Sequence, residues 1–342
     1  MGNESEKGKY DYNKNKSFKD KKKQIIKKND KIPDSFELIL NIKFNTEYFT
    51  IHELSYDRIG ILSKLNLYIY SLYTFKQIDI IKMQLPKNIF FKLFGEEKHY
   101  EDDTNKDFLE LYNSDIVIWS RNLILLYKLT NKGYQCYQNL KSNYLISSVY
   151  ELKNKDLATC GSFGLNIYSK EKNKYSLIEE YPLNSEVIKI IGKKENSFIL
   201  IQNKNKYSKH CVLTLYDTEG EDDDGNVKYD GNTYFSESPR FAMKNNYFVF
   251  NFNKECVILD KNNLSLKNKF QEYNFLGDFF DDFILIKDEK NKIINIGEYK
   301  DGNINICKSI PFYFDNIIKL SNGNIIGINR NQIKIINCIR NL

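Results

Sequence analysis

Short apolar runs separated by polar turns make up most of the chain, and one arrangement of them recurs. The segment HELSYDRIGIL at 52–62 indicates a strand, a tight polar turn and a second strand. In this segment and in segments 109–119 and 150–160, Glu-Leu is followed by a short polar stretch that ends in Asp before an apolar strand. Segment 318–328 has the same form, with Lys in place of Glu and Asn in place of Asp. The pattern predicts a recurring β-hairpin.

A third strand follows each hairpin after a short polar turn, as in NLYIYSL and LNIYSKE. Aligned positions in these third strands are Tyr70, Tyr127, Tyr168, Tyr216, Leu259, Gly297 and Ile336. They lie 57, 41, 48, 43, 38 and 39 residues apart, close to the ~40 to 45 residues of a propeller blade. Glu53, Glu110 and Glu151 are separated by the same 57 and 41 residues, so the hairpins and the third strands repeat in one register.

The units predict an all-β fold, a seven-bladed β-propeller of four-stranded antiparallel blades. A single four-stranded sheet cannot bury both faces, so the units must stack, and a closed ring removes the open ends. The last unit stops after three strands, and we expect the segment FELILNIKF at 36–44 to supply the fourth. The expected blades span about 50–83, 84–140, 145–183, 186–236, 239–273, 275–311 and 314–342, within a domain at 35–342 that follows a tail at 1–34.

These repeats resemble the WD40-like seven-bladed β-propellers over about residues 36–342. YIYSL, NIYSK and TLYDT stand where that family has Trp-Asp at the end of the third strand, and only Tyr216-Asp217 keeps the acid. The family's Gly-His before the first strand is not found. Trp119, the only tryptophan, falls in a second strand, where we expect it to pack. The resemblance implies a domain that binds other proteins through its loops and central mouth.

The formal charge of +6 lies entirely in the N-terminal segment, because residues 1–31 hold 11 Lys and 5 acidic residues. We expect this tail to be disordered and the neutral remainder not to bind nucleic acid, which needs clustered cations. The tail offers a polybasic contact at Lys19, Lys21, Lys22, Lys23, Lys27 and Lys28. Nuclear localisation, anionic-lipid binding and simple solubilisation remain open for it. Gly2 is a candidate for N-myristoylation, although Glu6 stands where the motif has Ser or Thr.

An apolar insertion at 84–107 lengthens the first repeat step. Phe90, Phe91, Leu93 and Phe94 can share one side of a short helix. Two interpretations stay open: packing back onto the propeller, or a partner-binding element on the rim.

Candidate catalytic and metal-binding residues are sparse. His52, His99 and His210 are scattered and are interpreted as incidental polar residues, and no phosphate loop, nucleophile elbow or zinc-protease motif occurs. The acidic run 217–231 does not fit a calcium loop and is interpreted as a solvated loop. The cysteines lie far apart, several within apolar runs, as expected of reduced thiols. We therefore predict no enzyme activity, no cofactor, no metal and no small-molecule substrate.

The sequence favours an intracellular, cytoplasmic protein that serves as a non-catalytic interaction scaffold or as a subunit of a complex. The alternative is a membrane-surface adaptor that the lysine-rich tail recruits to an anionic leaflet. The nucleus and the membrane periphery are the other locations that the tail leaves open.

Overall fold

The computed structural model describes most of the chain from residue 32 to residue 339. The described residues are 32–43, 49–63, 66–83, 106–162, 164–183, 186–194, 197–203, 210–217, 226–234, 240–244, 247–252, 255–261, 264–271, 273–280 and 282–339. Every regular element in these ranges is a β-strand, as the aromatic and β-branched composition favours.

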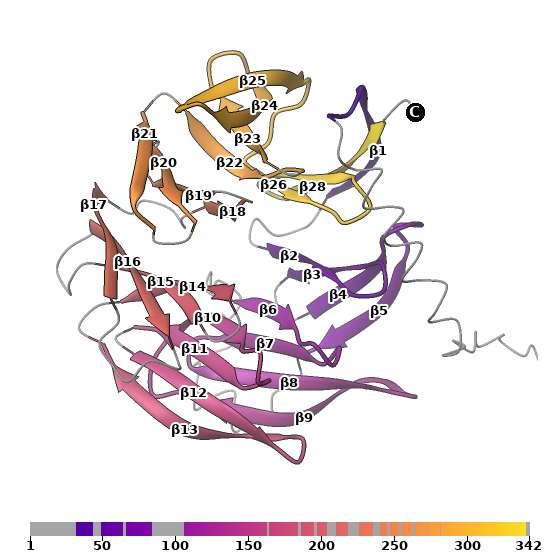
Figure 1. The fold of residues 1–342 in the computed structure, drawn as a ribbon. Helices are drawn as coiled ribbons and strands as arrows, with labels where there is room; N and C mark the ends of the chain where they lie inside the picture. The colour runs from indigo at the N-terminus through magenta and orange to yellow at the C-terminus, as the bar shows by residue number, and fades with distance from the viewer. Residues whose placement is uncertain are drawn as a thin grey trace, which may run out of the picture.

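The strands form seven sheets of four antiparallel strands, arranged around a common centre (Figure 1). Blades 1 to 3 contain β2(Phe49–Leu54), β3(Arg58–Ser63), β4(Asn66–Ser71) and β5(Gln77–Lys82); β6(Asp107–Glu110), β7(Ile116–Ser120), β8(Leu123–Thr130) and β9(Gly133–Lys141); and β10(Ile146–Glu151), β11(Leu157–Gly161), β12(Gly164–Glu171) and β13(Lys174–Pro182). Blades 4 and 5 contain β14(Val187–Lys194), β15(Ser197–Asn203), β16(His210–Asp217) and β17(Asn226–Tyr234); and β18(Arg240–Met243), β19(Tyr247–Phe252), β20(Glu255–Asp260) and β21(Leu266–Phe270). Blade 6 contains β22(Asn274–Asp278), β23(Phe283–Asp288), β24(Ile293–Lys300) and β25(Asn303–Ile310), and blade 7 contains β26(Asn316–Lys319), β27(Ile325–Asn329), β28(Gln332–Ile339) and β1(Ser35–Lys43). The predicted fold class is confirmed.

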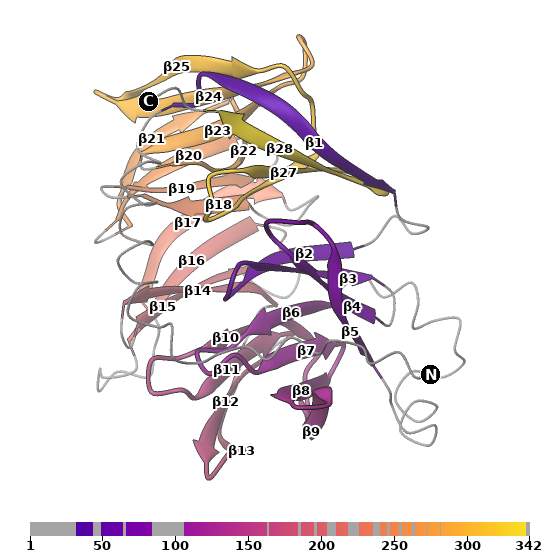
Figure 2. The ribbon, with the colours of Figure 1, turned by 90° about the vertical axis from the view of Figure 1, so that its right-hand side faces the viewer.

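The strand at the N-terminus completes the blade at the C-terminus. β1 pairs with β28 from Ser35 opposite Ile339 to Lys43 opposite Gln332, and Figure 2 shows the two strands side by side. Blades 7 and 1 share an apolar cluster that joins Leu320 and Ile326 to Ile51 and others. Both ends of the propeller are therefore held in one sheet.

The repeat found in the sequence corresponds to one row of paired residues in each blade. In blade 3 this row runs from Glu151 through Leu157 to Tyr168. The other rows are Glu53–Ile59–Tyr70, Glu110–Ile116–Tyr127, Gly192–Phe198–Tyr216, Met243–Phe248–Leu259, Asp278–Ile284–Gly297 and Lys319–Ile325–Ile336. All seven aligned third-strand positions are structurally equivalent.

One detail of the sequence alignment is wrong in blade 1. Asp115 and Asp156 each accept a backbone hydrogen bond, from Leu111 and Leu152, across the first turn of their blades. In blade 1 the residue opposite Leu54 is Arg58, so Asp57 belongs to the turn itself. The first turn of blade 1 is tighter, and a cation stands where blades 2 and 3 have an acid.

The two faces of the ring carry different turns. In an antiparallel four-stranded blade, the turn between the first and second strands and the turn between the third and fourth strands lie at the same end. We call this side the turn face. In blade 1 the backbone N–H of Leu72, from the later turn, donates to the carbonyl of Asp57, from the earlier one, at 2.7 Å. The second-to-third turns and the connections between blades lie on the opposite face.

Candidate protein-binding surface

The terminal acid of the first strand joins neighbouring blades on the turn face. Glu110 of blade 2 accepts hydrogen bonds from the Ser55 backbone N–H and hydroxyl of blade 1 and from the Arg58 guanidinium at 2.6 Å. Glu151 of blade 3 accepts from the backbone N–H of Tyr112 at 2.6 Å. The recurring Glu-Leu is therefore explained by contacts between blades as well as by the hairpin.

The residue at the end of the first strand also links neighbouring blades elsewhere in the ring. Glu53 accepts from the Ser321 backbone N–H at 2.8 Å, which ties blade 1 to blade 7. Asp278 of blade 6 pairs with the ammonium group of Lys244 of blade 5. Lys319 of blade 7 has the opposite charge and donates instead to the Phe279 carbonyl of blade 6, at 3.1 Å.

Three tyrosines form an exposed aromatic patch on the turn face of blades 1 and 2. Tyr56, Tyr73 and Tyr112 are 72%, 61% and 72% exposed, and we call them the tyrosine patch. The turns that carry Tyr56 and Tyr112 touch, since the hydroxyls of Ser55 and Ser114 lie 3.5 Å apart. Burial, together with the nearby Asp57 carboxylate, raises the Tyr73 pKa.

The turn that holds Tyr56 has an unusual backbone for its side chains. Tyr56 and Asp57 have φ of 58° and 55°, the pair of left-handed residues that a two-residue hairpin turn requires and that Asn-Gly usually supplies. For a bulky residue this conformation costs about 1–2 kcal/mol. Glu110 holds both flanks through Ser55 and Arg58, and Arg58 also donates to the Ser55 carbonyl at 2.9 Å. The next blade thus fixes Tyr56 in its exposed position.

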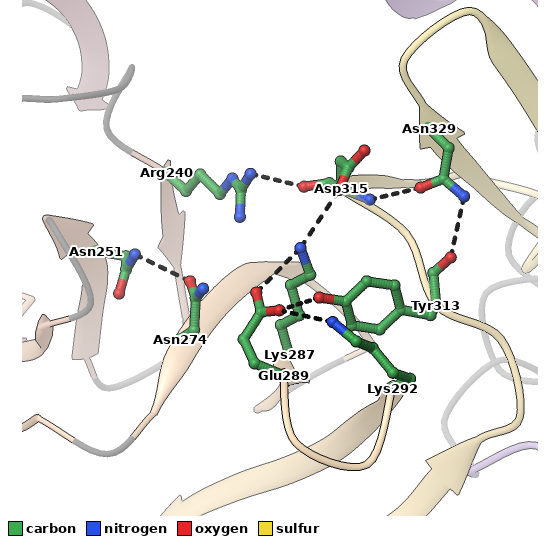
Figure 3. Close-up of polar contacts among 9 residues, drawn as sticks. All are labelled: Arg240, Asn251, Asn274, Lys287, Glu289, Lys292, Tyr313, Asp315 and Asn329. Atoms are coloured by element: carbon green, nitrogen blue, oxygen red, sulfur yellow. Dashed lines mark hydrogen bonds and ion pairs between the residues drawn. The ribbon is translucent and has the colours of Figure 1, made fainter.

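The opposite face carries a polar cluster across blades 5 to 7 (Figure 3). Lys287 lies between Glu289 at 3.1 Å and Asp315 at 3.4 Å, and Arg240 donates to the Asp315 carbonyl at 2.7 Å. Burial alone would lower the Lys287 pKa, but bonds to Tyr313 and Glu289 outweigh it and raise the pKa. Lys287 and Lys292 pair with Glu289 and Asp315, and Arg240 bonds the Asp315 backbone, so this cluster ties the blades together.

A histidine and a carboxylate meet between the innermost strands. His52 Nε2 lies 2.7 Å from Asp107 Oδ1, and Lys189 of blade 4 lies 4.0 Å from the other oxygen. Burial would raise the Asp107 pKa, but His52, Lys189 and the Phe108 backbone N–H outweigh it and lower the pKa. His52 joins blades 1 and 2 through this contact, which its interpretation from the sequence as an incidental polar residue did not foresee.

The predicted site residues fall outside the described part of the chain. This applies to Phe90, Phe91, Leu93 and Phe94, to Gly2, and to the lysines at 19, 21, 22, 23, 27 and 28. The sequence reasoning missed the tyrosine patch. Its signal was a tyrosine within the turn of two successive hairpins, in ELSYD and ELYNSD.

Comparisons with known proteins agree on the architecture. No protein-family profile matches the chain, and no curated protein matches it in sequence. Among solved structures, the RRP9 WD40 repeats superpose with a TM-score of 0.61 at 9% identity, covering 90% of this chain and 98% of that one. The Neurospora crassa Pan2 WD40 domain gives 0.64 at 10% identity, covering 90% and 96%.

The chain has the WD40 propeller fold. A chain of the Mitotic Checkpoint Complex structure also superposes on this propeller, with a TM-score of 0.63 at 9% identity over 99% of this chain and 98% of that one. In the part of the propeller that the structure describes, His, Cys, Asp and Glu do not form a group of three that could hold a metal ion. A helix with the length and apolar character needed to cross a membrane is likewise absent from the described ranges.

Proposed function

We propose that this protein is a non-catalytic interaction scaffold or a subunit of a multiprotein complex, which binds its partners through the turns of the propeller. The supporting observation is the tyrosine patch, with Tyr56 and Tyr112 each 72% exposed on adjoining turns. Tyrosine is enriched where protein interfaces bind most strongly, because it buries a large area at a small cost in side-chain entropy.

Rigidity supports the same conclusion. The turns that carry the patch are held by Glu110 and Glu151 of the following blades, and the ring is closed through β1 and β28. A surface that is already ordered loses little entropy when a partner binds, which favours affinity. The solved neighbours also include a chain from the structure of a complex, the Mitotic Checkpoint Complex. The membrane-surface alternative depends on Gly2 and the lysine segment, outside the described residues.

The native size of the endogenous chain in gentle cell extracts tests this proposal. Size-exclusion chromatography should show elution well above the 40.5 kDa monomer, and high salt should reduce the size if polar contacts hold the complex. Chemical cross-linking before lysis protects short-lived complexes and should give the same result. Elution at the monomer mass with and without cross-linking would contradict the scaffold proposal.

A further inference from the structure

We propose that a buried water molecule is bound between blades 2 and 3, where it bridges the Tyr175 hydroxyl to the carboxylates of Glu151 and Asp115. The ligand is a small neutral molecule that accepts one hydrogen bond and donates two. The site lies toward the turn face, at the boundary of two neighbouring blades (Figure 1). It does not depend on the scaffold function, because it concerns how the ring holds its turns together.

The Tyr175 hydroxyl is a buried donor without a hydrogen-bond partner among the residues that the structure describes. Tyr175 is 2% exposed and belongs to the apolar cluster shared by blades 2 and 3. A buried hydroxyl that makes no bond keeps the full cost of its desolvation, so such groups in folded proteins are bonded to protein or to ordered water. The orphaned hydroxyl therefore points to a ligand.

Blade 2 fixes the position of Tyr175 through its backbone. The Gln138 side-chain amide donates to the Tyr175 carbonyl at 2.6 Å and accepts from the Tyr175 N–H at 2.8 Å. The Lys170 ammonium group lies 5.1 Å from the centre of the Tyr175 ring, over its face. Because the backbone is clamped and the ring is packed in the apolar cluster, the hydroxyl has little freedom to turn toward another acceptor.

Three buried carboxylates act on this hydroxyl from the first turns of the two blades. Burial raises the Tyr175 pKa, and the charges of Glu151, Asp115 and Asp156 raise it further. These three side chains belong to buried residues, with 6%, 6% and 9% of their surface exposed. None of them accepts a hydrogen bond directly from the Tyr175 hydroxyl. Polar groups that influence one another without touching leave room for a bridging water.

Asp156 is excluded as the acceptor because both of its oxygens are already used. Its Oδ1 accepts from the Lys170 backbone N–H at 3.1 Å, and its Oδ2 accepts from the Asn154 amide at 2.7 Å. The bridge therefore has to end on the other two carboxylates.

Glu151 and Asp115 each bond to the protein through one oxygen. Glu151 Oε2 accepts from the Tyr112 backbone N–H at 2.6 Å. Asp115 Oδ2 accepts from the Asn113 amide at 2.8 Å and from the Tyr137 hydroxyl at 3.2 Å. Within the described ranges, no protein group donates to Glu151 Oε1 or to Asp115 Oδ1. Two acceptor oxygens from different blades are thus available beside one unused donor.

This set of groups matches water better than a metal ion. A buried water typically makes about three hydrogen bonds to polar groups that the protein leaves unsatisfied, and here it accepts from Tyr175 and donates to Glu151 and Asp115. A metal ion would need several ligands around one point. In the described part of the propeller, His, Cys, Asp and Glu do not form a group of three that could hold one.

Magnetic relaxation dispersion of ¹⁷O water counts the water molecules held inside the full chain in solution and tests the proposal. Tyr175→Phe removes the donor, and we expect the count to fall by about one. The melting temperature should also fall, by about 2 °C, because the bridge between the blades is lost. Tyr112→Phe is the matched control, since Tyr112 is 72% exposed, and it should change neither value.

A high-resolution crystal structure of the wild type identifies the ligand directly. We expect an ordered water within hydrogen-bond distance of Tyr175 Oη and of both carboxylates. A cation at this position would overturn the assignment to water, and the absence of any bound molecule would overturn the site.

The solution measurements can contradict the proposal in two ways. An unchanged water count in Tyr175→Phe would overturn it even if the variant melts earlier, because the hydroxyl would then bond directly to the protein. A higher melting temperature would also overturn it, since removing an unsatisfied hydroxyl from a dry site relieves its desolvation cost.

Discussion

Single residues decide how closely neighbouring blades approach. Gly60 lies in β3 against Phe108 of the next blade, and a Cβ added at Gly60 would stand 2.6 Å from the Phe108 ring. Both sides of this contact are rigid, because Phe108 is 1% exposed within the core cluster that joins blades 1 and 2. The glycine is thus required by packing between blades.

Gly60→Ala should lower the free energy of unfolding by about 1–3 kcal/mol, the usual cost of overfilling a close-packed core. Urea denaturation followed by circular dichroism measures this change. Gly302→Ala is not a suitable control because Gly302 has a φ of +81°. Ser309→Ala on an exposed outer strand is preferable, and an equal loss in both variants would contradict the packing explanation.

Glu151 makes the stability of the propeller depend on pH. Burial raises its pKa to about 6, while the Tyr112 backbone N–H and Lys170 favour the charged form and only partly offset the burial. A carboxyl group whose pKa is higher in the folded state than in the unfolded state binds more protons when folded. This group therefore favours folding below about pH 4.5 and costs stability as the pH rises through 6.

Glu151→Gln should raise the melting temperature at pH 7.5 and leave it nearly unchanged at pH 4.5. Glutamine keeps an oxygen that can accept from Tyr112 without a buried charge, so the gain at pH 7.5 should be about 1 kcal/mol or less. Thermal melts of both proteins at the two pH values measure the difference. A loss of stability at pH 7.5 would show that the negative charge is needed between blades 2 and 3.

At the scale of elements, the outer strand of blade 7 has a role that no other outer strand has. β1 comes from the start of the chain and pairs with β28 near its end. Ile32 and Phe36 also pack against the cluster shared by blades 6 and 7, and Lys308 of blade 6 donates to the carbonyls of Pro33 and Asp34 at 2.6 Å each. Closure therefore depends on a short stretch at residues 32–43.

Deletion of residues 1–43 should destabilise the propeller far more than deletion of residues 1–31. The longer deletion leaves β28 as an unpaired edge with exposed apolar neighbours, which favours aggregation. We expect a fall in melting temperature of more than about 10 °C or recovery in the insoluble fraction, against a change of about 2 °C or less for the shorter deletion. Similar behaviour of the two deletions would contradict closure through β1.

At the scale of the whole molecule, apolar clusters and polar contacts together join neighbouring blades around the ring. Apolar clusters join blades 1 and 2, 2 and 3, 3 and 4, 5 and 6, 6 and 7, and 7 and 1. The turn face carries the ties of Glu53, Glu110 and Glu151, and the opposite face carries the cluster around Lys287. Blades held at both faces cannot rotate freely, which makes the ring a rigid platform for partners.

The sequence alone determined the strand order, the number of blades and the source of the closing strand. Alternation of apolar and polar residues is a local property of an extended backbone, and a period of about 40 residues is a property of the chain itself. For this reason, Tyr70, Tyr127 and Tyr168 could be aligned before any contact was known, and they occupy equivalent rows.

Only the tertiary structure decided which residues meet between blades. Tyr56 and Tyr112 are 56 residues apart in sequence, and His52 and Asp107 are 55 apart, so their proximity depends on how successive sheets twist and stack. The sequence also does not reveal the left-handed backbone at Tyr56. A bulky residue disfavours this conformation, and Glu110 of the next blade holds it in place. Local patterns specify the blades, whereas contacts between distant parts of the chain create the surface.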